Sequence, residues 1–384
     1  HFGLFGKRNA GKSSLINALA NQNISIVSSV AGTTTDPVEK AFELSPIGPV
    51  VFMDTAGIDD EGDLGLARVE KSLSVLEWMD IAIVVCEAGT WGSHEENILK
   101  KTLNNGTPTI VVFNKTDLCK PTKEHVQALR SRGYKVIETS AANREGISDL
   151  RDAIIQTVLE KTEPDRPLMG ELAKAGDTVL LVTPIDTGAP KGRLILPQVQ
   201  AIRELLDAGA KCFVIKEDRI TETLNELKQP PQLVVTDSQV VLRVVKEVPE
   251  PIPVTTFSIQ MAYSKSDLLE MAIGAAALTK LKPGDKVLIA ETCSHHPLKD
   301  DIGRVKIPNW LRKTFGDLNI DIAVGKDFPT DLTPYKVIIQ CGGCIVTRRH
   351  MLARLRQAKA QGVPMTNYGV TISYLQGVLP RVLA

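Results

Sequence analysis

The segment at 6–13 constrains the fold more than any other stretch of this chain. It reads GKRNAGKS and matches G-x-x-x-x-G-K-[ST], a loop whose backbone N–H groups wrap the phosphates of a nucleotide. An apolar run at 2–5 precedes it and a helical pattern at 14–19 follows it, which is the order that the motif requires. We therefore expect Lys12 to contact the phosphates and Ser13 to bind Mg²⁺. Because the sequence begins directly on the strand, we expect a short segment to precede it.

A polar loop at 28–37 follows the first helix and shows neither a helical nor a strand period. In a nucleotide switch, such a loop supplies a threonine that holds Mg²⁺ and the γ-phosphate and that is released after hydrolysis. We expect Thr34 to play this part, with Thr33 as the second choice.

An apolar strand at 50–53 leads into the sequence DTAG at 54–57. The Asp54 carboxylate can hold the Mg²⁺ shell, and the Gly57 N–H can reach the γ-phosphate. Ile58 follows, where some GTPases place a glutamine that orients the attacking water. Another group must therefore orient the water in this chain.

Two further strand ends supply the groups for a base-binding site. The sequence NKTD at 114–117 follows one apolar strand, and TSAA at 139–142 ends another. Asp117 can accept two hydrogen bonds from N1 and N2 of guanine, which adenine cannot supply, so this carboxylate selects GTP over ATP. We expect the Ala141 N–H to donate to the guanine oxygen.

These motifs occur in the order, and at the strand ends, that a GTP-binding α/β domain requires. The residues expected to contact GTP are Gly6, Asn9, Ala10, Gly11, Lys12, Ser13, Ser14, Thr33, Thr34, Asp54, Gly57, Asn114, Lys115, Asp117, Ser140 and Ala141. Those expected to take part in hydrolysis are Asn9, Lys12, Thr34, Asp54 and Gly57.

This region resembles the GTPases related to the tRNA-modification and ribosome-assembly proteins. The resemblance rests on Asn9 within the phosphate loop, on the sequence AGTT at 31–34 and on the apolar residue after DTAG. It implies that Asn9 helps to coordinate K⁺, which stands where an arginine finger would otherwise place positive charge. We therefore expect K⁺, and not Na⁺, to accelerate GTP hydrolysis.

At 384 residues the chain is too long for one core and should hold two or three domains. Proline-rich segments at 161–167 and 249–253 mark boundaries, and strand and helix patterns alternate beyond each, including an apolar helix at 266–281. We predict three doubly wound, mainly parallel-sheet α/β domains: a P-loop GTPase domain at 1–165, a small α/β dimerisation domain at 170–252 and a Rossmann-like domain at 255–384. The middle domain shows no recognisable catalytic set, so we assign it to assembly of a homodimer.

The charge balance bears on the partners of the chain. Lys and Arg number 45 and Asp and Glu number 45, which leaves no global field to gather nucleic acid. We predict that nucleic acid is not a partner. No apolar run approaches the roughly 20 residues that span a bilayer, and no secretory signal is visible, so we predict no membrane association and a cytoplasmic location.

Three of the six cysteines follow apolar runs in the C-terminal region. Cys293 follows one run, and Cys341 and Cys344, within the sequence CGGC, follow another. Ligands of open parallel sheets gather at the carboxyl ends of the strands, so we expect these cysteines to share one crevice, lined also by Tyr368. Three converging thiolates under cytosolic conditions indicate an iron-sulfur cluster or zinc. A redox dithiol is the alternative for the Cys-x-x-Cys pair, but it would not need Cys293.

The spacing does not settle the fourth ligand. His295 and His296 lie beside Cys293, and Asp300 and Asp301 follow. We retain His295 and Asp300 as the candidates. A cluster held by three cysteines and an exchangeable fourth group would leave one iron open to a second species, which indicates a carrier rather than plain electron transfer.

The GTPase motifs, together with CSH at 293–295 and CGGC at 341–344, resemble the family of maturation GTPases of iron-only (FeFe) hydrogenase, HydF. The resemblance covers essentially the whole chain. It implies that Cys293, Cys341 and Cys344 hold a 4Fe-4S cluster, and that the protein receives a diiron precursor and passes it to the apo-hydrogenase. It also implies two radical-SAM maturases as partners. The family usually has a histidine before the Cys-x-x-Cys pair, where this chain has Gln340, so no ligand role carries over to that position.

The alternative interpretation is a ribosome- or tRNA-related GTPase with a structural zinc site. Such a protein would need a basic surface for RNA, and the neutral charge of the chain argues against one.

Overall fold

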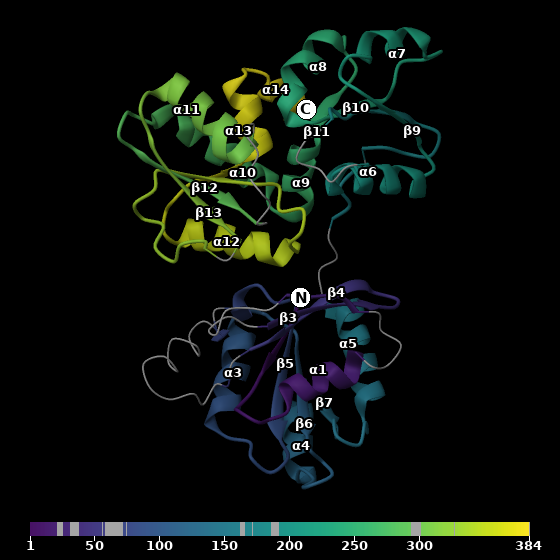
Figure 1. Cartoon of the computed structure of the whole chain (residues 1–384), viewed down its shortest axis with the longest axis vertical. Coiled ribbons are helices and arrows are strands. Elements are labelled where there is room, and N and C mark those ends of the chain that lie inside the picture. Colours follow the sequence, from purple (N-terminus) through teal and green to yellow (C-terminus); the bar gives the residue numbers. More distant parts are fainter. Residues whose placement is uncertain are drawn as a thin grey trace. The chain divides into compact units, whose positions relative to one another are not determined.

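The computed structural model describes the chain apart from residues 21–25, 31–37, 56, 58–71, 74, 162–165, 171, 186–191, 293–300, 326 and 384. The chain divides into two compact units, His1–Pro164 and Asp165–Ala384, and most of their helices and strands are labelled in Figure 1. Among the described residues, no helix combines the length and the apolar character that crossing a bilayer requires.

The first unit is built on a seven-stranded sheet with the order β2-β3-β4-β1-β5-β6-β7. Five of its strands form a parallel ladder, whereas β2 and β3 pair antiparallel at one edge. The central strands β5 and β6 are buried and almost wholly apolar, as strands covered on both faces require. The strands are β1 (Phe2–Phe5), β2 (Ile26–Val30), β3 (Val38–Leu44), β4 (Gly48–Asp54), β5 (Ile81–Glu87), β6 (Thr109–Asn114) and β7 (Lys135–Glu138).

Helices cover both faces of this sheet (Figure 1). Leu15 of α1 and Ile154 of α5 belong to the apolar cluster on one face, and Leu99 of α3 and Leu129 of α4 belong to the cluster on the other. The helices are α1 (Lys12–Ala20), the short 3₁₀ turn η1 (Val75–Glu77), α3 (Ser93–Asn104), α4 (Lys123–Ser131) and α5 (Ile147–Lys161). This is the doubly wound arrangement expected for the first domain.

The second unit begins with a four-stranded parallel sheet of order β11-β10-β8-β9, which we call the middle sheet. Helices α6 and α9 contribute to the apolar cluster on one of its faces, and α7 and α8 to the cluster on the other. The elements are β8 (Thr178–Val182), α6 (Leu196–Asp207), β9 (Lys211–Ile215), α7 (Ile220–Glu226), β10 (Leu233–Thr236), η2 (Ser238–Val240), α8 (Val241–Glu247), β11 (Val254–Thr256) and α9 (Phe257–Lys265).

A second four-stranded parallel sheet, of order β13-β12-β14-β15, completes this unit. One apolar cluster runs from Leu180 in the middle sheet to Ile289 and Ile339 here, so the two sheets share a core. The elements are α10 (Leu268–Ala275), η3 (Ala276–Lys280), β12 (Lys286–Glu291), η4 (Ile302–Lys306), α11 (Ile307–Phe315), β13 (Asn319–Val324), β14 (Val337–Gln340), α12 (Arg348–Ala360), β15 (Met365–Asn367), α13 (Tyr368–Leu375) and α14 (Leu379–Leu383). The predicted fold class is confirmed, and the exact limits of the three domains stay a prediction.

The apolar helix expected at 266–281 is shorter in the structure. It begins at Leu268, because the Asp267 side chain accepts a hydrogen bond from the Glu270 N–H and caps the first turn. It continues beyond Ala275 as the 3₁₀ helix η3. Gly274 allows close packing on β15, since a Cβ there would lie 1.9 Å from the Met365 carbonyl oxygen.

Candidate functional site

The phosphate loop connects β1 to α1 and is held by its own lysine. Lys12 is buried, and its Nζ donates to the carbonyl oxygens of Gly6 and Lys7, each at 2.9 Å. Asn9 is exposed and has a φ of 58°, and Gly11 has a φ of 91°. A Cβ on Gly11 would lie 2.1 Å from the Asn114 Nδ2, so both its backbone conformation and its surroundings require glycine.

Two residues predicted to bind Mg²⁺ are in contact at the end of this loop. The Ser13 hydroxyl donates to the Asp54 carboxylate, which stands at the carboxyl end of β4. The following Thr55 donates its hydroxyl to the Leu4 carbonyl at 2.5 Å and so fixes the DTAG segment on β1. Gly57, two residues further along the chain, is buried. Thr33 and Thr34 lie outside the described residues.

The Asn114 side chain links the phosphate loop to the predicted base-binding segments by hydrogen bonds. It is 1% exposed, and its Nδ2 donates to the Ala10 carbonyl at 2.9 Å. Its Oδ1 accepts from the Thr139 hydroxyl at 3.1 Å and from the Ala141 N–H at 3.2 Å. The N–H that we predicted to meet the guanine oxygen therefore donates to Asn114 in this structure.

The predicted guanine-selecting carboxylate is oriented by a serine. Asp117 is exposed, and its Oδ1 accepts from the Ser140 hydroxyl at 2.6 Å. The Ser140 hydroxyl in turn accepts from the Asn143 N–H at 3.2 Å. Lys115, at a φ of 61°, pairs with Glu87 at 2.9 Å. Glu87 was not among the residues predicted from the sequence. Its position at the end of β5 could have indicated it, because β5 ends at the same edge of the sheet as the strands that carry the predicted site residues.

A second cluster of polar groups lies at the carboxyl ends of β12 and β14. The Cys341 Sγ accepts from the Thr292 N–H at 3.2 Å and lies 3.3 Å from the Thr292 hydroxyl. The Gln340 Nε2 is 3.4 Å from the same sulfur. Thr292 directly precedes Cys293 in the sequence, and Cys293, His295 and Asp300 lie outside the described residues.

The other cysteine of the pair is half-buried. Cys344 packs against the apolar cluster of the middle sheet, which includes Met261. Burial raises the pKa of its thiol, and the nearby Cys341 raises it further, so a cation that binds there must displace a proton. Gly343, at a φ of 67°, makes the turn between the two cysteines, and a Cβ there would lie 2.6 Å from the Met351 Sδ.

A buried carboxylate flanks these cysteines. Glu291 is 1% exposed, and its Oε2 accepts from the Arg304 Nε at 3.2 Å and the Nη2 at 3.0 Å. Tyr368 lies at the same sheet end, where its hydroxyl is 3.3 Å from the Glu291 Oε1. Burial raises the pKa of Tyr368 well above its ordinary value, and the charges of Cys341 and Glu291 add to this. Gly303 leaves room for the contact, since a Cβ there would lie 2.1 Å from the Tyr368 hydroxyl.

A buried arginine of α12 contacts the residue that precedes the cysteine pair. Arg354 is 4% exposed, and its Nη1 donates to the Gln340 Oε1 at 3.0 Å. Its Nη2 donates to the Gly325 carbonyl at 2.6 Å, and its guanidinium lies 4.6 Å from the ring centre of Phe328. Its buried Nε has no acceptor among the described residues. Those residues contain no set of three His, Cys, Asp or Glu side chains placed to hold a metal ion.

Comparisons with protein families match three segments of the chain. Residues 1–115 match a family described as 50S ribosome-binding GTPase. Residues 168–266 match the hydrogen maturase F dimerization domain, and residues 269–384 match the hydrogen maturase F tetramerization domain.

Curated relatives match part of the chain. The tRNA modification GTPase MnmE of Bacillus velezensis is 37% identical over 153 residues, which are 39% of this chain and 33% of that protein. MnmE of Clostridioides difficile is 36% identical over the same shares. This chain therefore spans about a third of the length of these relatives.

Solved structures of GTPases are also similar. The G domain of the T. maritima FeoB iron transporter is 21% identical, with a TM-score of 0.33, over 40% of this chain and 96% of that one. Aquifex aeolicus Era bound to GDP.AlF4- is 22% identical, with a TM-score of 0.34, over 58% and 96%.

The hydrogen bonds of Asn114 give a testable prediction. We expect Asn114→Ala to destabilise the first unit by about 1–3 kcal/mol, because it leaves the buried Ala10 carbonyl without its donor. Nucleotide affinity should fall with it, since the same amide supports both predicted binding segments. Chemical denaturation and a fluorescent GDP analogue measure the two effects. Asn104→Ala, at an exposed position of α3, serves as the control. Equal stability and equal nucleotide affinity of the two variants would contradict the linking role of Asn114.

Proposed function

The chain belongs to the hydrogen maturase F family, and from this premise we propose that it is a GTP-hydrolysing scaffold for metallocofactor assembly. In this proposal it holds a 4Fe-4S cluster, receives a diiron precursor as cargo and delivers the diiron unit to apo FeFe-hydrogenase. The observation that carries the proposal is the contact of Thr292, the neighbour of Cys293 in sequence, with the sulfur of Cys341. The same chain has a P-loop GTPase domain.

The GTP site would work through the residues of the phosphate loop. Lys12, now bonded to loop carbonyls, would turn its ammonium to the phosphates, and Ser13 and Asp54 would hold Mg²⁺. Asn114, Lys115, Asp117, Ser140 and Ala141 would form the guanine site. Asn9 is exposed in the loop and is our candidate for K⁺ coordination, while Thr34 and Gly57 would sense the γ-phosphate.

The residues of the C-terminal site fit a thiolate-bound, anionic group. Cys341 receives hydrogen bonds from its neighbours, and the cationic Arg354 has a buried Nε–H that lacks an acceptor among the described residues. We propose that Cys293, Cys341 and Cys344 hold the cluster, with His295, Asp300 or an external group as the fourth ligand. When bound, the cluster supplies an iron whose fourth ligand can be exchanged.

GTP would act by changing which partners the scaffold prefers. The two radical-SAM maturases would load the precursor, and the apo-hydrogenase would receive it. Binding or hydrolysis of GTP shifts such preferences only if GTP favours one arrangement of the switch segments over another. The proposal places the protein in the cytoplasm, where thiols stay reduced, and the described cysteines are all free thiols.

Homodimer formation is proposed through the open edge of the middle sheet. β9 is an edge strand, and its Phe213 and Val214 are 41% and 43% exposed. Val199 and Leu206 of the neighbouring α6 add further exposed apolar surface. Unpaired backbone groups beside apolar side chains suit pairing with a second copy of the chain. The matching dimerization-domain family supports this assignment.

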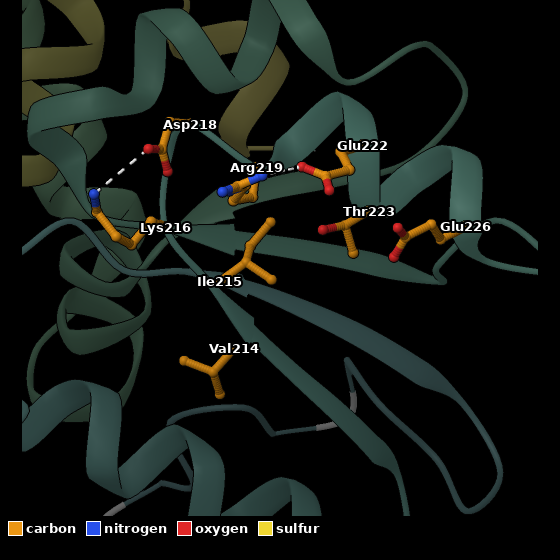
Figure 2. A pocket seen from close by; sticks show the side chains of 8 residues that line it. All are labelled: Val214, Ile215, Lys216, Asp218, Arg219, Glu222, Thr223 and Glu226. Atoms are coloured by element: carbon orange, nitrogen blue, oxygen red, sulfur yellow. Dashed lines mark hydrogen bonds and ion pairs between the residues drawn. The ribbon is translucent and has the colours of Figure 1, made fainter.

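The end of this edge is polar. Beyond Val214, Lys216 pairs with Asp218 at 3.5 Å, and Arg219 pairs with Glu222 at 2.5 Å (Figure 2). These groups line a hollow of about 420 Å³. An apolar strand with a charged end is the pattern of an interface with an apolar centre and a polar rim.

The first prediction from this proposal concerns the monovalent cation. We expect faster GTP turnover in KCl than in NaCl, and we expect Asn9→Ala to remove the difference, because the variant lacks the side-chain oxygen. Release of inorganic phosphate measures turnover. Asn17→Ala on α1, whose amide oxygen accepts from Lys40 at 2.6 Å, should keep the difference. Equal turnover of the wild type in both salts would refute the role of K⁺.

The second prediction concerns assembly. We expect the wild-type chain to form a dimer or a multiple of a dimer. Val214→Lys should lower the mass of the assembly, because a lysine buried between two β9 edges opposes their pairing. Light scattering after gel filtration gives the mass. Leu118→Lys, at an exposed apolar position of the first unit, should leave the assembly intact. An unchanged mass for Val214→Lys would exclude this edge as the interface.

The third prediction tests the cluster. After anaerobic reconstitution, we expect close to four iron and four sulfide per wild-type chain and a large loss of both in Cys341→Ser, since a ligand is missing. Metal analysis and visible absorption measure the content. Cys119→Ser should retain the cluster, because Cys119 is an exposed thiol of the first unit. Zinc in place of iron and sulfide in the wild type would support the structural-zinc alternative.

A further inference from the structure

Gln340 is fixed in one orientation beside the cysteine that follows it. Its side chain is fully buried at the end of β14. Its Nε2 donates to the Ala290 carbonyl at 3.0 Å and lies 3.4 Å from the Cys341 Sγ. Its Oε1 accepts from the Arg354 Nη1 at 3.0 Å. The reverse orientation would set the amide NH₂ against the guanidinium, which has only donors, so the N–H side must face the sulfur.

Arg354 brings a positive charge to the same place. Its three acceptors are neutral: the Gln340 amide oxygen and the carbonyls of Gly325 and Glu291. Burial lowers the pKa of Arg354 to about 10, against the influence of Cys341, so the group is charged at neutral pH. Within the described part of the chain, the acceptors of its hydrogen bonds include no carboxylate. A buried cation without a counter-charge is costly, and an anionic group at Cys341 would supply the counter-charge.

We propose that Gln340 and Arg354 are positioning residues that raise the reduction potential of the cluster bound at Cys341. Reduction adds one negative charge to the cluster, and N–H donors to a ligand sulfur and a nearby buried cation both stabilise that charge. Gln340 acts through the Cys341 sulfur and is not a ligand itself. This inference rests on the proposed function, because it requires a cluster at the three cysteines.

The test is a redox titration of the full-length, reconstituted protein. Sodium dithionite supplies one electron to convert [4Fe-4S]²⁺ to [4Fe-4S]⁺, and electron paramagnetic resonance follows the reduced form. We expect Gln340→Met to shift the midpoint potential to a more negative value, because methionine has a similar volume but no N–H. Arg354→Met should shift it in the same direction, and Arg354→Lys, which keeps the charge, should shift it less.

Two matched controls lie on α12. Gln357 donates its amide to the Pro329 carbonyl at 2.8 Å, away from the cysteines, and Arg356 is exposed. Gln357→Met and Arg356→Met should leave the potential at the wild-type value. Should Gln340→Met not fold, Gln340→Glu takes its place. It keeps an acceptor for Arg354 and lacks the N–H, and its potential should also fall.

The outcomes separate the two proposals. A wild-type chain that takes up no cluster overturns the proposed function, and this inference with it. Full iron and sulfide in Gln340→Met or Gln340→Glu, with the wild-type potential, overturns the inference alone. A potential that rises in these variants overturns it as well. A fall in both the Gln340 and the Arg354 variants, with unchanged controls, supports it.

Discussion

The parallel pairing of β12, β14 and β15 is the constraint on which the C-terminal site depends. Ala290 pairs with Gln340, and Gln340 pairs with Asn367, so the three strands end at one level of the sheet. Residues that follow those ends meet there, although they are far apart in the sequence. A slip of β14 by one residue would exchange its two faces and turn the Gln340 amide away from the Cys341 sulfur.

The sheet of the first unit also brings polar groups together at the carboxyl ends of its strands. The Ser13 contact with Asp54 joins the phosphate loop to the end of β4, and Asn114 at the end of β6 joins it to the segment at 139–141. Each contact spans two strand ends. The segments predicted to hold the phosphates and the base are therefore positioned by hydrogen bonds to one another as well as by the sheet.

Local sequence patterns were sufficient for the fold class and for the loops at the strand ends, because apolar strands and glycine-rich turns are local signals. They were not sufficient for Arg354 or for the Glu291–Arg304 pair. A basic residue in a helical stretch reads as part of a solvated face, and only the tertiary fold shows that Arg354 is 4% exposed. The C-terminal limit of α10 was missed because apolar residues continue beyond Ala275 through Ala277 and Leu278, where the chain forms the 3₁₀ helix η3. The predictions for Thr33, Thr34, Cys293, His295 and Asp300 remain open, since those residues lie outside the described ones.

The packing of Cys344 has a consequence for the second unit as a whole. Its side chain contacts the apolar cluster formed by α6, α9 and the middle sheet. In the proposed function this sulfur is a cluster ligand as well as a packed side chain, which would couple cluster occupancy to the conformational stability of the module that carries the exposed β9 edge. Loading the proposed site would then rigidify the β9 edge, which is the proposed subunit contact, and emptying the site would relax that edge.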